Sequence, residues 1–204
     1  MDCLWTIREA AAIADLPART IRSAIDRDYF RSATHRGGQR RSGHLLCLRD
    51  LVYLKLLAEF PFILSKADKA AFEMLVRGRR SSVGRWRLAG RDLMLATESM
   101  NVHIDYGRLR ENLARNAAAF HWGQRRIISD RTILEGEPVF QGTRVTLQEV
   151  AALSRKGACA AELAEAFPEL SELDHEFAQI YARLGKRPGR PRKSLHLRRT
   201  ERAA

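Results

Sequence analysis

A cluster of arginine and hydroxyl side chains near the N-terminus has the chemistry of a nucleic-acid contact. Within nine residues the chain carries Arg19, Thr20, Arg22, Ser23 and Arg27. Guanidinium groups pair with guanine edges in the major groove and with phosphates, and short hydroxyls can bond to either. A Gly-Gly stretch follows, with three more arginines that would track a phosphate backbone: Arg36, Arg40 and Arg41. The alternative is a helical hairpin for protein contact, whose arginines form a solvated face.

Two short helices joined by a tight turn would position these side chains. Thr6 and Glu9 form a capping-box pattern that begins a first helix. Pro17 suits the start of a second helix, and the leucines of residues 48–57 predict a third. A helix, a tight turn and a second helix place the second helix in the major groove. Residues 1–60 are therefore predicted to be a winged helix-turn-helix domain that binds DNA.

The C-terminal end of the chain is a second basic segment. Residues 185–204 are rich in Pro, Gly and Arg and almost free of apolar residues, which predicts disorder. The stretch from Lys186 onward resembles an AT-hook, which lies in the minor groove of A·T-rich DNA. The tail residues expected to contact DNA are Arg187, Arg190, Arg192 and Lys193. Pro188 stands where an AT-hook has its first core arginine, so generic phosphate contact and no function stay open as alternatives.

Charge is segregated along the chain. The net charge is +12 overall, with +3 in residues 1–60, +7 in residues 61–126 and +8 in residues 183–204. Residues 127–182 are acidic, at −6. Basic surface favours polyanions because binding releases counterions, so nucleic acid is the first partner to consider. A basic protein without such a partner would be expected to carry its excess charge more uniformly.

The acidic segment carries three short motifs in a fixed order. They are Glu135-Gly136-Glu137-Pro138-Val139-Phe140, Gly142-Thr143-Arg144-Val145 and Phe167-Pro168-Glu169-Leu170. These motifs resemble the domain of unknown function 433 family, in which a tyrosine is usual where Phe167 stands. That family is similar to small helix-turn-helix domains and is associated with antitoxins whose partners are PIN-like ribonucleases. Residues 1–60 resemble the winged helix-turn-helix of MerR-type regulators and VapB-type antitoxins.

The resemblance implies a VapB-type antitoxin of a type II toxin–antitoxin system. Such a protein would neutralise a PIN-like ribonuclease toxin and repress its own operon by binding operator DNA, as a homodimer on two half-sites. Acidic residues would be steered to the basic RNA-binding surface of the toxin. The toxin-binding candidates are Arg144, Glu162, Glu165, Phe167, Glu169 and Glu172, and Asp174 and Glu176 belong to the same acidic cluster. Arg144 could instead clamp its own domain, and a stand-alone MerR-like transcription regulator is the alternative function.

The periodicity predicts a mainly α (α+β) protein in four parts. After the winged helix-turn-helix domain of residues 1–60, residues 61–123 form a small α+β connecting or dimerisation region. This region holds a helix capped by Ser65, a three-stranded meander and a second helix. Residues 124–184 form a trihelical, helix-turn-helix-like antitoxin domain, and residues 185–204 are a disordered basic tail.

Catalysis, metal binding and cofactor binding are not predicted. The chain shows no P-loop, GxGxxG, HExxH or nucleophile-elbow pattern, although distant acids could still converge in a nucleic-acid-processing enzyme. His175, flanked by acids, is expected on the solvated surface. Cys3, Cys47 and Cys159 form no CxxC pair and are expected to be buried structural thiols. A cytoplasmic protein without membrane contact is expected, because neither a signal-peptide pattern nor an apolar span is present.

Overall fold

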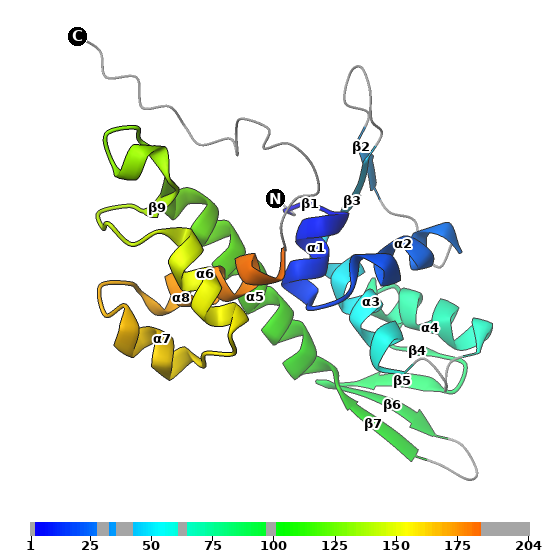
Figure 1. Cartoon of the computed structure of the whole chain (residues 1–204). Helices are drawn as coiled ribbons and strands as arrows, with labels where there is room; N and C mark the ends of the chain where they lie inside the picture. Colours follow the sequence, from blue (N-terminus) through cyan, green and yellow to red (C-terminus); the bar gives the residue numbers. More distant parts are fainter. Residues whose placement is uncertain (1–2, 28–32, 36–42, 61–64, 97–100, 185–204) are drawn as a thin grey trace. The chain divides into compact units, whose positions relative to one another are not determined.

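The computed structural model describes residues 3–27, 33–35, 43–60, 65–96 and 101–184. Helices dominate these residues and are joined by small antiparallel sheets, which confirms the predicted mainly helical α+β class (Figure 1). The chain divides into an N-terminal unit, residues 1–117, and a C-terminal unit, residues 118–204. The finer division into four parts stays a prediction, and the tail expected to be disordered lies outside the described residues.

The N-terminal unit begins with the predicted pair of helices. Helix α1 (Ile7–Ala14) begins at the capping box, in which the Glu9 N–H donates to Thr6 Oγ1 at 3.4 Å and the Thr6 N–H donates to Glu9 Oε2 at 2.9 Å. It ends at Asp15, whose left-handed backbone, with φ of 51°, turns the chain toward α2 (Ala18–Asp26). Pro17 is the residue just before α2, so its fixed φ leads into the helix.

A three-stranded sheet and a third helix complete this part of the N-terminal unit. Strand β3 (Gly43–Leu46) lies between β1 (Trp5–Thr6) and β2 (Ala33–His35), and both pairings are antiparallel. Helix α3 (Leu48–Glu59) follows and packs against α1 and α2. Their shared core contains side chains that are almost completely buried, including Ile13, Ile21, Leu46, Leu51 and Leu54.

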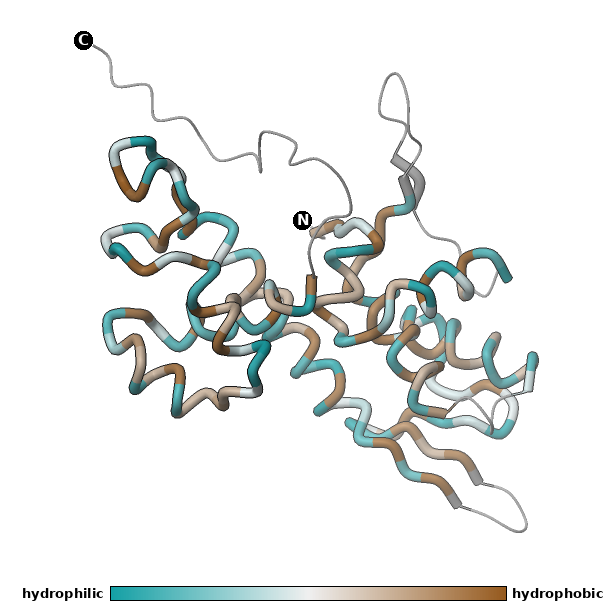
Figure 2. The backbone as a smooth tube through the Cα atoms, viewed as in Figure 1, coloured by the Kyte–Doolittle hydropathy of each residue, from teal (hydrophilic) through white to brown (hydrophobic). Residues whose placement is uncertain are grey.

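The second half of the N-terminal unit is a helix on a meander. Helix α4 (Lys66–Val76), capped by Ser65 as predicted, packs on α3 and on one face of a four-stranded antiparallel sheet. The sheet runs in chain order through β4 (Ser82–Val83), β5 (Trp86–Ala89), β6 (Asp92–Ala96) and β7 (Asn101–Asp105). Sequence alternation predicted the last three strands and missed β4, because two residues are too few to show a period. Figure 2 shows hydrophobic and hydrophilic residues interspersed along these strands.

Helix α5 (Tyr106–Arg126) contributes residues to both units and crosses the boundary at residue 123 that the sequence suggested. Leu113 is buried in the N-terminal unit, where the Asn116 side chain also donates to the Ile13 carbonyl at 2.9 Å. Phe120 is buried in the C-terminal unit. Within the described part of the chain, no helix has both the length and the apolar character that crossing a membrane requires.

The C-terminal unit contains the predicted trihelical arrangement. A short pair of strands, β8 (Ile127–Ile128) and β9 (Val139–Phe140), precedes α6 (Leu147–Arg155), α7 (Ala160–Ala166) and α8 (Glu172–Arg183). Helix α8 packs on both α6 and α7. The caps of α6 and α8, Thr146 and Ser171, were recognisable in the sequence, whereas the Cys159 cap of α7 was not. The core is formed by buried side chains that include Phe140, Leu147, Val150, Leu163, Phe177 and Ile180.

Three expectations about burial were wrong. Cys3 and Cys159 are exposed and Cys47 is half-buried, because Cys47 and Cys159 are the N-cap residues of α3 and α7 rather than core residues. Helical spacing places Leu173 on one apolar stripe with Phe177 and Ile180, but Leu173 is 36% exposed. His175, expected in solvent, is buried and its Nε2 lies 3.2 Å from the carbonyl oxygen of Phe167. Helix α8 is thus rotated so that polar residues of its first turn face inward.

Candidate nucleic-acid interface and acidic surface

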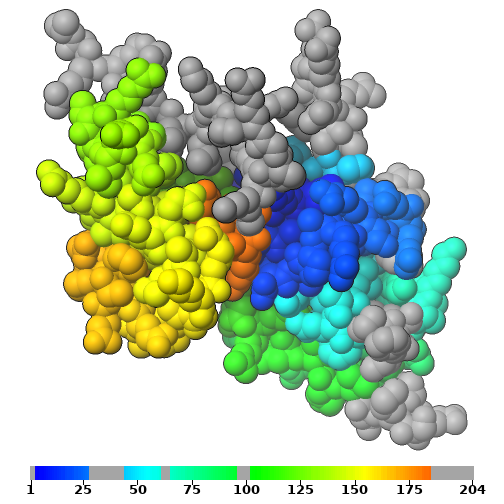
Figure 3. All heavy atoms as spheres, in the orientation of Figure 1, coloured from blue at the N-terminus to red at the C-terminus, as the bar shows by residue number. Residues whose placement is uncertain are grey.

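The exposed side of α2 carries the predicted arginines. Ile21 and Ala24 are buried against the core, whereas the three arginines are exposed and Thr20 and Ser23 are half-buried. The arginines are Arg19, Arg22 and Arg27. Helices α1 and α2 form part of the face shown in blue in Figure 3. Because no carboxylate of the described residues pairs with these arginines, their guanidinium groups are available to an anionic ligand.

The remaining predicted DNA contacts lie outside the described residues. They are Arg36, Arg40 and Arg41 in the connection between β2 and β3, and Arg187, Arg190, Arg192 and Lys193 in the tail. The strands that flank the first group are described, and they pair as a hairpin in which His35 lies opposite Gly43.

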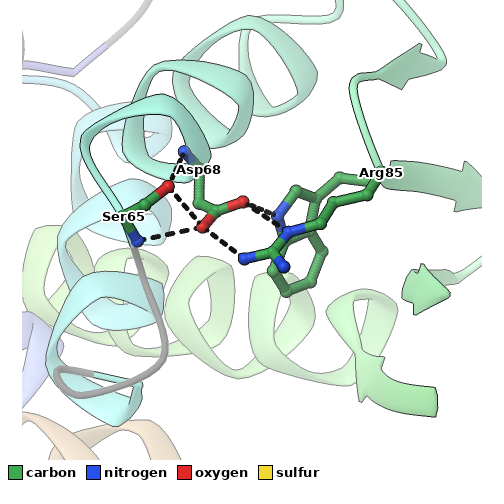
Figure 4. A network of polar contacts seen from close by, with 4 residues as sticks. Ser65, Asp68 and Arg85 are labelled. Carbon is green, nitrogen blue, oxygen red and sulfur yellow. Dashed lines mark hydrogen bonds and ion pairs between the residues drawn. The ribbon is translucent and has the colours of Figure 1, made fainter. Parts of the chain in front are cut away.

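Asp68 organises a polar network beside α4 that the sequence analysis did not find (Figure 4). Its buried carboxylate accepts from the Ser65 backbone at 2.9 Å and from the Ser65 hydroxyl at 2.7 Å. It also accepts two hydrogen bonds from Arg85, at 3.1 and 2.8 Å, and one from the Trp86 indole at 2.7 Å. The hydrogen bonds from Arg85 hold the pKa of Asp68 well below its usual range, although burial opposes them. Only the Ser65 cap was visible in the sequence.

The segment around this network is rich in arginine. Arg77 pairs with Asp50 and Glu73, and Arg91 pairs with Glu111. Three further arginines are exposed, and no carboxylate of the described residues pairs with their side chains: Arg79, Arg80 and Arg87. No motif in the sequence singles out these arginines, although the net charge of +7 over residues 61–126 is a signal that points to this segment.

The glycine-containing motifs of the C-terminal unit form a turn between β8 and α6. The 3-10 helix η1 (Leu134–Gly136) lies in this turn, and Gly136 has a φ of 90° that a glycine adopts without strain. The Ser129 hydroxyl donates to the Gly136 carbonyl, and the Thr143 hydroxyl donates to the Phe140 carbonyl at 3.0 Å. Arg144 is exposed and contacts no described carboxylate, so the structure offers no support for Arg144 as an internal clamp.

The acidic candidates lie over α7 and the start of α8. Four are exposed: Glu162, Glu165, Glu169 and Glu172. Phe167 is half-buried at the end of α7, and Glu162 also accepts from the Cys159 N–H as part of the helix cap. Asp174 does not belong to the acidic surface, because it is completely buried, and Glu176 is half-buried. The surface available to a partner is therefore smaller than the sequence suggested.

Asp174 instead joins α5 to α8. It accepts from the Ser171 hydroxyl at 2.7 Å, from the Trp122 indole at 3.1 Å and from Arg126 at 3.5 Å. Burial raises the pKa of Asp174, but the hydrogen bonds from Ser171, Trp122 and Arg126 together lower it below its usual range. Trp122 stays 37% exposed, with the Arg126 guanidinium 5.9 Å from its ring centre, and Leu173 beside Asp174 is also exposed. The C-terminal unit thus exposes two large apolar side chains, and Leu173 directly follows the exposed Glu172 in the chain.

The comparisons with known proteins bear on the C-terminal unit alone. Among the described residues, no three His, Cys, Asp or Glu side chains are grouped to hold a metal ion. No curated protein and no solved structure matches the chain. Residues 127–182 match the family described as "Protein of unknown function (DUF433)", which spans the elements from β8 to α8. The resemblance seen in the motifs is confirmed for residues 127–182, which are similar to this family.

Proposed function

We propose that the chain is a DNA-binding antitoxin, in which the N-terminal unit binds operator DNA and the DUF433 domain binds a PIN-like ribonuclease toxin. The observation that carries this proposal is the exposed arginine face of α2. Helix α2 follows α1 after a tight turn at Asp15 and is followed by the hairpin of β2 and β3. This order of elements is that of a winged helix-turn-helix, in which the second helix enters the major groove.

The proposed contacts divide between base edges and phosphates. Arg19 and Arg22 on α2 have the length and the donors to pair with guanine, while Thr20 and Ser23 can bond to bases or phosphates. The connection between β2 and β3 would be the wing, and its three arginines would contact the adjacent backbone. Basic residues of the C-terminal tail would add minor-groove or phosphate contacts.

The proposed toxin surface combines charge with an apolar anchor. Four exposed glutamates lie over α7 and the start of α8 and would be steered to the basic RNA-binding surface of a ribonuclease. Charge mainly sets the rate of encounter, whereas apolar and aromatic anchors that become buried set the lifetime of a complex. Phe167 and the exposed Trp122 and Leu173 supply such anchors. The association of DUF433 domains with antitoxins is consistent with this assignment.

A homodimer belongs to the same proposal, since two half-sites about one helical turn apart are commonly read by paired domains. The leucine-rich face of α3 does not supply the dimer contact, because Leu51, Leu54 and Leu56 are buried within the N-terminal unit. Residues 61–123 are the proposed dimerisation region. Sedimentation at micromolar concentration should show a dimer, and a monomer that also binds DNA as a monomer contradicts this part of the proposal.

Two variants separate the proposed activities in cells. The chain is expressed with the product of the adjacent open reading frame and with a reporter under its own upstream DNA. Arg19→Ala with Arg22→Ala should abolish repression and still rescue growth, whereas Glu165→Lys with Glu169→Lys should weaken rescue. Arg155→Ala with Lys156→Ala, two exposed basic residues of the C-terminal unit, is the control and should leave DNA repression unchanged. Repression that survives the loss of Arg19 and Arg22 contradicts the proposed DNA contact.

A further inference from the structure

The arginines between α4 and β6 divide into two groups by their partners. Arg77, Arg85 and Arg91 pair with carboxylates of α3, α4 and α5 and fix this segment to the rest of the N-terminal unit. Arg79, Arg80 and Arg87 are exposed, and the described residues offer them no carboxylate partner. The first group therefore has a structural role, and the second group leaves three positive charges on the surface with no structural role to explain them.

The hairpin of β4 and β5 holds Arg87 in a defined place, and Arg79 and Arg80 lie in the connection just before β4. Trp86 is 1% exposed and donates to Asp68, so the start of β5 is tied to α4. The next residue, Arg87, points to the opposite, exposed face and lies across from Ser82 in the pairing of β4 with β5. The Leu88 N–H donates to the Ser81 carbonyl at 2.7 Å, which extends the contact toward Arg80. A rigid element of this kind presents charge without losing much conformational entropy.

We propose that Arg87 on the exposed face of the β4–β5 hairpin, with Arg79 and Arg80 just before the hairpin, forms a second contact of the N-terminal unit with the phosphate backbone of duplex DNA. This inference rests on the proposed DNA-binding function and assigns a role to residues 61–126, which hold a larger net charge than residues 1–60. Phosphate contacts need cationic and hydroxyl donors and carry no base sequence.

The chemistry of the surface favours a duplex over a single strand. Exposed Ser81 and Ser82 add hydroxyl donors of the kind that bind phosphate oxygens. Proteins that bind single-stranded nucleic acid stack the bases on exposed aromatic rings. The aromatic residue of this hairpin, Trp86, is buried under Phe72, with ring centres 4.4 Å apart, so it offers no such platform.

The test compares two triple variants of the full chain that lose the same charge. One is Arg79→Ala, Arg80→Ala, Arg87→Ala, and the matched control is Arg131→Ala, Arg155→Ala, Lys156→Ala, whose side chains are exposed in the C-terminal unit. Affinity for a 40-base-pair duplex of mixed sequence is measured from about 50 to 200 mM salt. Each lost phosphate contact reduces the magnitude of the slope of log affinity against log salt by about 0.9. The slope of the hairpin variant should therefore be smaller by about 2 to 3, and the slope of the control should be unchanged.

The outcomes separate the inference from the proposed function. If the salt slope is unchanged in the hairpin variant but smaller in Arg19→Ala, Arg22→Ala, the inference is overturned and the proposed function stands. If the slope is smaller in the hairpin variant alone, the inference is supported and the role of α2 in DNA binding is overturned. If the original chain does not bind duplex DNA, both the inference and the proposed function are overturned. An equal loss in the control, or an equal loss of affinity for a single-stranded RNA, overturns the inference. The charge-preserving variant Arg79→Lys, Arg80→Lys, Arg87→Lys should restore the slope.

Discussion

The two units are stabilised by the same arrangement of residues, used in two ways. In each, a Ser-x-x-Asp capping box begins a helix, and the buried aspartate also accepts from a tryptophan and an arginine of another element. In the N-terminal unit, Asp68 receives a two-bond contact from arginine and a 2.7 Å bond from Trp86, which is 1% exposed. In the C-terminal unit, Asp174 receives 3.1 and 3.5 Å bonds from Trp122 and Arg126, and Trp122 is 37% exposed.

In both units, the residues that stabilise the fold are distinct from the charged residues on the surface. Both carboxylates fix the tertiary packing of their unit, and neither is available to a partner. The surfaces around them carry opposite charge: arginines are left unpaired on α2 and on the β4–β5 hairpin, and glutamates are left exposed over α7 and α8. The shared arrangement therefore says how each unit is held together, while the charge that remains on the surface points to the partner.

The largest expected effect is at the contact between α5 and α8. A Cβ added at Gly123 would lie 1.9 Å from the Phe177 ring, so Gly123→Ala must separate the two helices that Asp174 joins. Overpacking of this kind costs about 3 kcal/mol in unfolding free energy. Urea unfolding should show this loss, whereas Gln124→Ala, at an exposed position of the same helix, should stay within about 0.5 kcal/mol. A Gly123→Ala protein as stable as the original would mean that the helices are not so close.

The two aspartates should differ when each is removed. Asp68→Ala leaves the buried Trp86 indole N–H without an acceptor, which costs about 2 to 3 kcal/mol. Asp174→Ala should cost about 1 to 2 kcal/mol, because the half-exposed Trp122 and Arg126 can bond to water instead. Denaturant unfolding of both variants checks the order. A larger loss for Asp174→Ala would show that burial of the carboxylate, rather than of its donors, decides the cost.

Both aspartates should also make the protein sensitive to acid. Their folded-state pKa values are lowered from the ordinary value of 3.8, so their contribution is complete above about pH 4 and is lost as the pH falls through the folded-state values. The free energy of unfolding should therefore decrease between about pH 4 and pH 2. Asp68→Asn and Asp174→Asn should each flatten that decrease. An equally steep decrease in both variants would assign the acid sensitivity to other carboxylates.

The smallest effect on stability is expected from the surface charges. Arg79→Ala, Arg80→Ala, Arg87→Ala and Glu165→Lys, Glu169→Lys should each change the free energy of unfolding by less than about 0.5 kcal/mol per residue, since these side chains are exposed. Thermal unfolding of both variants measures this. A loss of several kcal/mol in either variant would show that these charges support the fold, and the separation between stability and surface charge would fail.

Local signals in the sequence predicted most of the elements. Capping boxes at Thr6, Ser65, Thr146 and Ser171 mark four helix starts because a cap depends on residues three apart. The two-residue strand β4 carried no period to detect. The sequence suggested a boundary between regions near residue 123, whereas helix α5 continues to Arg126 and the two units divide after residue 117. Only packing decides where one unit ends and the next begins.

The networks at Asp68 and Asp174 could not be predicted in the same way. Each aspartate looks like an ordinary capping residue, and its tryptophan partner lies 18 or 52 residues away in the chain. Asp174 was consequently assigned to the acidic surface, although it is completely buried. The exposed arginines of α2 were predicted because helical periodicity alone places them opposite Ile21 and Ala24. Those of the β4–β5 hairpin were missed because β4 was missed.

A direct titration tests the central claim, that α2 binds DNA. The full chain and its Arg19→Ala, Arg22→Ala variant are titrated with the DNA upstream of the coding sequence and with a duplex of scrambled sequence. The original protein should prefer the upstream DNA, and the variant should lose roughly 10-fold to 100-fold in affinity for it, as expected when bidentate arginine contacts to bases are removed. Equal affinity of both proteins for the upstream DNA would contradict the proposed function.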